Sequence, residues 1–182
     1  MVNCPSSERA NHSNNLINWN EDASGAQGVN RVKSELVAET ARKFGEVRLQ
    51  LAGTSMFPCL MPGDIVTVRR CGVEDFRPGE IAKYIRDGRL FAHRVVGVED
   101  GRLITRGDTL RKDDAPVHAE EIVGKVVSVL RGGTTFTPRI APSRGERALA
   151  NMARHSNLAL RILYFLLKTR PTPLEQTALC QN

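Results

Sequence analysis

The chain has 182 residues, a formal net charge of +6 and only 5% aromatic residues. This length suits one domain of ordinary size with tails at its ends. The four cysteines stand far apart and form no C-x-x-C pair, which argues against a zinc knuckle or a disulfide scaffold and favours a reducing compartment. The four histidines are too scattered for a ligand cluster, so we expect neither a metal nor an organic cofactor.

Residues 1–30 are rich in Asn, Ser and Gly and show no periodicity, so we expect a disordered arm. No apolar run in them exceeds two residues, which predicts neither a secretory signal peptide nor an N-terminal membrane anchor. The character then changes, because apolar residues recur at helical spacing between Val32 and Phe44. This spacing predicts a short amphipathic helix over 31–44 that packs on the domain.

From residue 46 the apolar period becomes two, which is typical of half-buried strands. The expected strands lie at 46–53, 64–70, 80–86, 90–98, 102–106 and 121–130. Asp87-Gly88 and Asp100-Gly101 are predicted hairpin turns between neighbouring strands. The spacing is short and regular, so the fold class expected is mainly β, with an antiparallel domain at about 46–133.

Residues 144–168 return to helical character and predict an amphipathic C-terminal helix. Its run at 162–167 (ILYFLL) is apolar all round but falls well short of the ~20 residues that span a bilayer. The chain is therefore expected to divide into a disordered arm, a β domain with a leading helix, and a basic helical tail, at 1–30, 31–137 and 138–182.

Most of the excess charge lies on that tail. Residues 138–182 carry seven basic and two acidic side chains, a net charge of +5. A basic amphipathic helix is typical of contact with an anionic membrane surface, and packing back onto the sheet is the equal alternative. Nucleic acid is disfavoured as a partner because the β domain has few aromatic rings for base stacking. We expect a protein of the cytoplasm or one held peripherally at the membrane.

Four short stretches carry the candidate chemistry: GTSMFP at 53–58, RPGEI at 77–81, AHRVVG at 92–97 and TRGD at 105–108. A serine nucleophile needs a neighbouring base and a donor for the developing oxyanion. Ser55 follows a strand and a glycine, and His93 offers an imidazole that can accept its proton. An aspartate could hold the imidazole in its useful tautomer. The plain structural alternative is a turn serine, a half-buried strand histidine and turn-forming aspartates.

Taken in order, these stretches resemble the boxes of the type I signal peptidase superfamily over about residues 45–131. Histidine at the base position is similar to the archaeal and endoplasmic-reticulum-type branch. The resemblance implies Ser55 as nucleophile and His93 as general base. It also implies catalytic roles for Asp108, the aspartate of the Gly-Asp box, and for Asp114, the second acidic position. Asp113 is a neighbour that could substitute for Asp114.

Several positions depart from the family's pattern. Lys83, one strand earlier than His93, is the other candidate base. Some relatives carry an oxyanion-stabilising hydroxyl where Gly53 stands, which leaves the backbone N–H of Ser55, helped by Thr54, as the donor. Cys59 stands where relatives often have threonine and is expected to be a small buried thiol. The missing N-terminal anchor implies a different peptide substrate or attachment through the tail.

The function expected is therefore that of a serine endopeptidase that cleaves a peptide or preprotein through an acyl-enzyme. The resemblance implies an extended substrate bound along a strand edge, with small residues before the cut. One alternative is a catalytically silent peptide-binding module of the same fold. Another is a self-cleaving repressor-type regulator, disfavoured because 44 leading residues cannot hold a usual DNA-binding helix-turn-helix and because the scissile Ala-Gly is missing.

Overall fold

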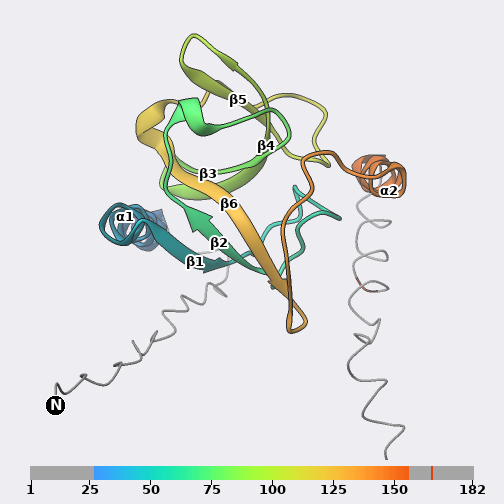
Figure 1. The fold of residues 1–182 in the computed structure, drawn as a ribbon, viewed down its shortest axis with the longest axis horizontal. Coiled ribbons are helices and arrows are strands. Elements are labelled where there is room, and N and C mark those ends of the chain that lie inside the picture. Colours follow the sequence, from blue (N-terminus) through green and yellow to red (C-terminus); the bar gives the residue numbers. More distant parts are fainter. Residues whose placement is uncertain (1–26, 156–164, 166–182) are drawn as a thin grey trace, which may run out of the picture.

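The computed structural model describes residues 27–155 and residue 165. The fold is mainly β, as predicted: seven antiparallel strands form one sheet, with one helix before it and one after it (Figure 1). The elements in chain order are α1 (Gln27–Phe44), β1 (Glu46–Gln50), β2 (Ile65–Arg69), the 3-10 turn η1 (Val73–Asp75), β3 (Ile81–Arg86), β4 (Arg89–Glu99), β5 (Arg102–Arg106), the 3-10 turn η2 (Ala119–Glu121), β6 (Ile122–Arg131), β7 (Thr134–Phe136) and α2 (Arg144–His155).

The strand order in the sheet is β1-β2-β6-β3-β4-β5, with β7 added to β6. Two long strands hold the sheet together. β6 pairs with β2, β3 and β7, whereas β4 pairs with β3 over its first half and with β5 over its second half. Among the described strands β1 has only β2 as a neighbour, so its other edge is free, and so is the second edge of β4 over residues 89–93.

The predicted hairpin turns are confirmed. Asp87 and Gly88 have φ of 51° and 70°, and Asp100 and Gly101 have 47° and 70°. Two successive residues with positive φ form the tight turn whose twist suits a two-residue hairpin. Both ends of each predicted strand lie within three residues of the ends of an observed strand. The short β7 strand was not predicted, because three residues after a Gly-Gly turn carry no readable alternation.

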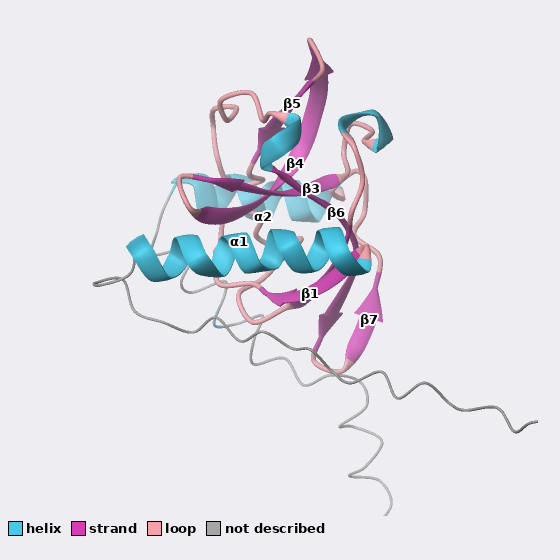
Figure 2. Ribbon diagram, turned by 90° about the vertical axis from the view of Figure 1, so that its left-hand side faces the viewer, coloured by secondary structure: helices cyan, strands magenta, loops and turns pink. Residues whose placement is uncertain are grey.

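Helix α1 lies across one face of the sheet and contacts β1, β4 and β6 (Figure 2). It buries Val37 and Ala41 in the main core, whereas Val32 and Phe44, which bounded the predicted apolar stripe, are exposed. The predicted boundary also changes, because residues 27–30, assigned above to a disordered arm, form its first turn. That turn holds a single apolar residue, so hydrophobic periodicity could not reveal it. Residues 1–26 lie outside the described part.

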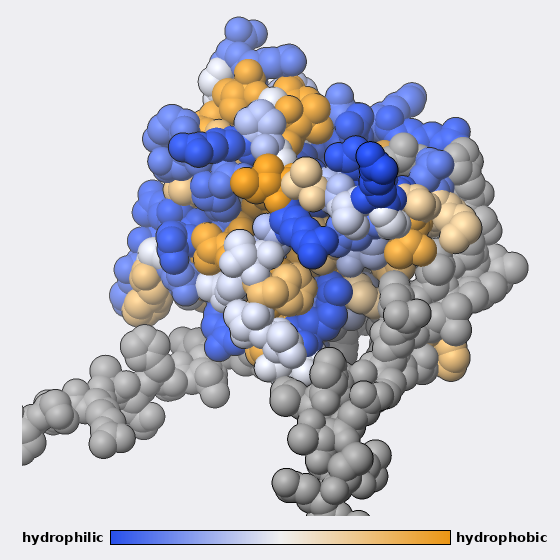
Figure 3. Space-filling view, turned by 45° about the vertical axis from the view of Figure 1, so that its right-hand side comes forward, coloured by the Kyte–Doolittle hydropathy of each residue, from blue (hydrophilic) through white to orange (hydrophobic). Residues whose placement is uncertain are grey.

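A second core fills the other side of the curved sheet and includes Tyr84, Leu103 and Val117. Toward the same end the β4–β5 hairpin projects from the body, and Figure 3 shows apolar side chains gathered there, with Val96 and Val98 of β4 exposed. No helix in the described ranges 27–155 and 165 is long and apolar enough to cross a membrane.

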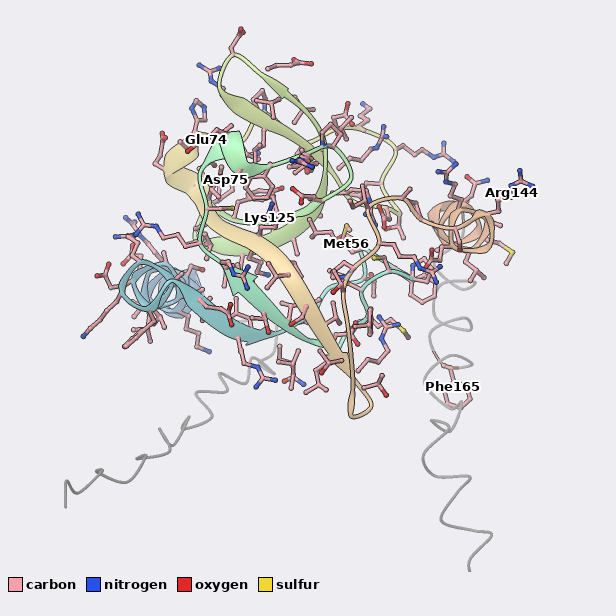
Figure 4. All side chains as sticks on the ribbon, viewed as in Figure 1. Met56, Glu74, Asp75, Lys125, Arg144 and Phe165 are labelled. Carbon is pink, nitrogen blue, oxygen red and sulfur yellow. The ribbon has the colours of Figure 1, made fainter. Side chains whose placement is uncertain are left out.

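Helix α2 packs on the segment between β1 and β2. Its Ala153 and Leu149 contact Phe57 and Met61, and Phe57 is fully buried. In Figure 4, Met56 lies between the strands of the sheet and α2, where Arg144 marks the start of the helix. The first part of the predicted tail helix is therefore part of the domain. Of its remainder only Phe165 is described, as an exposed helical residue, and the rest of the ILYFLL run lies outside the described residues.

Candidate active site

Ser55 lies in the turn that follows β1, where the chain leaves the sheet edge. Its carbonyl oxygen accepts hydrogen bonds from the backbone N–H and the hydroxyl of Thr109, at 2.9 and 3.1 Å. Gly107 sits close to the same carbonyl, and a Cβ at that position would lie 2.9 Å from the Ser55 oxygen. The stretch after β5 therefore fixes the backbone that presents the Ser55 hydroxyl.

His93 occupies the middle of β4, opposite Ala82 of β3, and its residue is only 3% exposed. Its Nε2 atom lies 3.0 Å from the Ser55 hydroxyl oxygen. Two side chains separated by 38 residues in the chain are thus within hydrogen-bond reach. This is the contact that a nucleophile and a general base require.

The other ring nitrogen of His93 contacts an acidic residue. Its Nδ1 lies 2.7 Å from a carboxylate oxygen of Asp114, which also accepts the hydroxyls of Thr105 at 2.7 Å and Tyr84 at 3.1 Å. Nδ1–H donating to Asp114 leaves Nε2 free to accept the Ser55 proton. The arrangement is a chain of contacts from Ser55 through His93 to Asp114.

Asp114 carries its negative charge in this setting. Its partial burial would raise the carboxyl pKa, but the hydrogen bonds from His93, Thr105 and Tyr84 outweigh burial, so the pKa lies below its usual value. Tyr84 keeps its proton, because burial raises its pKa to about 12. The hydroxyl can therefore donate to Asp114 at any ordinary pH.

Asp108 has a different partner. It forms a two-point pair with Arg94, with both N···O distances 2.8 Å. The same guanidinium donates to the carbonyls of Gly79 and Arg139, at 2.7 and 2.9 Å. Asp108 thus holds Arg94 in place, and Arg94 links β4 to the segment that leads to α2. Asp113 pairs at the surface with Arg106, at 3.3 Å. Of the three aspartates considered from the sequence, Asp114 is the one that hydrogen-bonds His93.

A buried carboxylate, Asp64, holds the loop that carries Ser55. Asp64 accepts the backbone N–H of Met61 at 2.7 Å and pairs with Arg131 of β6. Arg131 also donates to the carbonyl of Cys59 at 3.0 Å, so both ends of the turn are tied to β6. Cys59 is buried, as expected, and burial raises the pKa of its thiol. A buried thiol with a raised pKa is a poor nucleophile.

Lys83 does not take the base position. Side chains alternate along a strand, so Lys83 lies on the opposite face of β3 from Ala82 and His93's neighbour Tyr84. Burial lowers the pKa of its amine to about 8. Lys83 nevertheless lines the same small hollow as Ser55, which places it near the site from the other side.

Neither a scan against family models nor a search of curated proteins finds a match to this chain.

The backbone N–H of Ser55 is available as an oxyanion donor, since no acceptor within residues 27–155 receives it. Gly53 and the space around it are open, with no atom within 4 Å of where a Cβ would stand. A substrate carbonyl could thus approach the hydroxyl and the N–H of Ser55 together. This expectation for the oxyanion donor stays a prediction.

Two neighbouring hollows with shared lining residues lie near Ser55, between the free edges of β1 and β4. The smaller, of about 70 Å³, is lined by Ser55, Ala52 and Ala92 among others. The larger, of about 200 Å³, is lined by Leu49 and Leu90 and reaches α1. Gln50, Ala52 and Lys83 line both hollows, so we call them together the trough. A trough between two unpaired strand edges is suited to an extended peptide.

The structure also shows contributors that the sequence did not single out. Tyr84 and Thr105 hold Asp114, and Arg131 holds Asp64. Asp64 stood inside a recognisable Gly-Asp pair, but Arg131 had no local signal because its partner lies 67 residues earlier. Such pairs depend on strand order, which hydrophobic periodicity does not supply.

Proposed function

We propose that this protein is a serine endopeptidase that cleaves a peptide or preprotein through an acyl-enzyme. The observation that carries the proposal is the chain of contacts Ser55–His93–Asp114, with distances of 3.0 and 2.7 Å. Turn chemistry alone would not require three side chains from separate segments to meet in this order. The order of the motifs, which resembles the Ser/His branch of the type I signal peptidase superfamily, supports the same function.

In the proposed mechanism His93 Nε2 takes the hydroxyl proton as Ser55 Oγ attacks the scissile carbonyl carbon. The negative charge on the carbonyl oxygen is received by the backbone N–H of Ser55. Asp114 stabilises the imidazolium and keeps its ring oriented. His93 then gives the proton to the leaving amine as the peptide C–N bond breaks. Water, deprotonated by His93, attacks the acyl-enzyme and releases the second product.

The trough supports an extended substrate. The free edges of β1 and β4 offer backbone N–H and C=O groups to which a peptide could add as a strand. The hollow beside Ser55, of about 70 Å³, leaves room only for a small side chain. This agrees with the expectation of small residues before the cut.

The test is mass spectrometry of a peptide library and of candidate precursor proteins incubated with the wild type or with Ser55→Ala. We expect new termini after small residues in the wild-type sample only. The His93→Ala protein should be slower by about 10²–10⁴-fold, the usual contribution of a proton-transferring base. Cleavage that persists unchanged in Ser55→Ala would contradict the proposal, and peptide binding with no cleavage would favour the silent binding module.

A further inference from the structure

Lys83 is the one buried basic group in the trough, and the chemistry proposed above does not use it. The residue is 5% exposed. No hydrogen bond or ion pair to its amine occurs within residues 27–155 and 165, and burial alone accounts for the lowered pKa. An amine with a pKa of about 8 is still mostly protonated at neutral pH. A positive charge without a partner in an apolar setting is costly, unless a ligand supplies the opposite charge.

The surroundings of Lys83 favour an anionic ligand. It lines both hollows of the trough, and no acidic side chain from the described residues lines either hollow. The larger hollow adds two more basic residues, Lys33 of α1 and Arg89 of β4. The hydroxyl of Ser34 donates to the carbonyl of Gly88 at 2.8 Å and so fixes α1 against the turn beside this hollow.

One extended peptide can place side chains in both hollows. Alternate side chains of a strand point to the same side and stand about 7 Å apart. A peptide that places one small side chain in the hollow beside Ser55 therefore directs the side chain two residues away toward the larger hollow. Lys83 lines both hollows, so a carboxylate bound in the larger one would lie beside this residue.

We propose that Lys83 selects substrates with an aspartate or glutamate two residues from the small residue at the cleavage site. This inference rests on the proposed function and specifies its substrate class. The acidic side chain enters the larger hollow, and its carboxylate pairs with the Lys83 amine. The pair leaves neither charge isolated, because the peptide closes the trough over it. Neutral peptides leave the lysine unpaired and bind more weakly.

The experiment measures binding and cleavage separately. Fluorescent peptides with a small residue at the cleavage position and Glu, Gln or Lys two residues away on either side are titrated into the full-length Ser55→Ala protein. The same titration is made with a protein that carries both Ser55→Ala and Lys83→Met. The second substitution keeps roughly the length of the side chain and removes its charge. Lys43→Met, an exposed lysine in the last turn of α1, is the matched control. The wild type is then profiled for cleavage with the same peptides.

We expect the Glu peptide to bind at least about tenfold more tightly than the Gln peptide, the usual cost of leaving one partner of a buried pair alone. The preference should vanish in Lys83→Met and persist in Lys43→Met. Equal affinities for Glu and Gln peptides would overturn the inference, as would a preference that survives in Lys83→Met. If the peptides are cleaved with no preference for the acidic one, the role of Lys83 is overturned and the proposed peptidase activity stands. Acid-selective binding without any cleavage overturns the proposed enzyme and leaves the role of Lys83 standing.

Discussion

At the scale of single residues, two adjacent side chains of β4 contact different aspartates. His93 contacts Ser55 and Asp114, whereas Arg94, the next residue, pairs with Asp108. Adjacent side chains of a strand point to opposite faces, so the two aspartates cannot both serve the imidazole. Asp114 is therefore placed to orient His93, the proposed base, whereas Asp108 holds the fold through Arg94.

The two aspartates should therefore respond differently to the same change. Asp114→Asn removes the carboxylate that fixes the His93 tautomer, so kcat should fall by roughly 10³–10⁴-fold, with a smaller loss of stability than in Asp108→Asn. Asp108→Asn leaves the buried Arg94 without its counter-charge, so the free energy of unfolding should fall by about 3–5 kcal/mol. Urea titrations, with kcat measured at a temperature where both variants are folded, check this. Equal losses of kcat in the two folded variants would contradict the assignment.

Lys83 should give the fold a particular pH dependence. Its pKa is about 8 in the folded chain and near 10.5 when exposed, so between these values the unfolded state binds more protons. The free energy of unfolding therefore rises with pH across this window, by on the order of 3 kcal/mol in all. Urea midpoints at pH 7 and pH 9.5 should show the rise in wild type and its loss in Lys83→Met. If the urea midpoints of wild type and Lys83→Met changed equally with pH, the Lys83 amine could not be buried without a partner.

The sequence could name Ser55 and His93 as members of one candidate site, because each sits in a short motif, and their side chains do lie within hydrogen-bond reach. It could not choose among Asp108, Asp113 and Asp114. All three fit a polar loop after β5, and the choice depends on the register of β4 against β5 and on the path of that loop. The side-chain partners Tyr84 and Thr105 depend on the same register.

At the scale of elements, the two hairpin turns offer a matched comparison. Gly88 and Gly101 have the same φ of 70°, but a Cβ on Gly88 would lie 3.2 Å from the Cβ of Arg31, whereas nothing lies within 4 Å at Gly101. Helix α1 therefore packs closely against the β3–β4 turn and not against the β4–β5 turn.

Gly101→Ala should cost about 1–2 kcal/mol, the backbone strain of a left-handed residue. Gly88→Ala should cost more, because α1 must also move away from the turn. Urea denaturation of both variants measures the difference. Equal losses of stability would mean that α1 does not pack against the β3–β4 turn.

The elements also show where periodicity succeeds. Alternation predicted β1, β2 and β5, in which alternate residues are buried, and Asp-Gly turns with positive φ marked the ends of β3, β4 and β5. β3 buries four successive residues, Ile81 to Tyr84, so both of its faces are covered. The existence of α1 was predicted, but of the apolar residues that predicted it, Val32, Leu36, Val37 and Phe44, only Val37 is buried. Ser34, Val37 and Ala41 face the sheet, and two of these are small, so the larger Val32 and Leu36 dominated the pattern although they are exposed.

At the scale of the whole molecule, the basic tail divides into two parts. α2 covers the loop that carries Ser55, since its Ala153 packs on Phe57 and Met61. Residues 156–182, with three basic and one acidic side chain, follow it. Membrane contact through the tail remains a proposal for this second part.

Two truncations test the two parts of the tail separately. Removal of 156–182 should reduce flotation with anionic liposomes, because basic and apolar side chains are lost together. Removal of 144–182 should also lower the thermal midpoint by several degrees, since it uncovers the buried Phe57. Flotation that is unchanged after removal of 156–182 would exclude this segment as the anchor.

In the proposed mechanism His93 activates Ser55. The most direct measurement is intact-protein mass spectrometry after treatment with a fluorophosphonate probe, with the modified residue located by peptide mapping. A single adduct should form on Ser55 of the wild type, much more slowly in His93→Ala and Asp114→Asn, and not at all in Ser55→Ala. An adduct that forms equally well in Ser55→Ala, or a wild-type Ser55 that the probe leaves unmodified, would contradict the account.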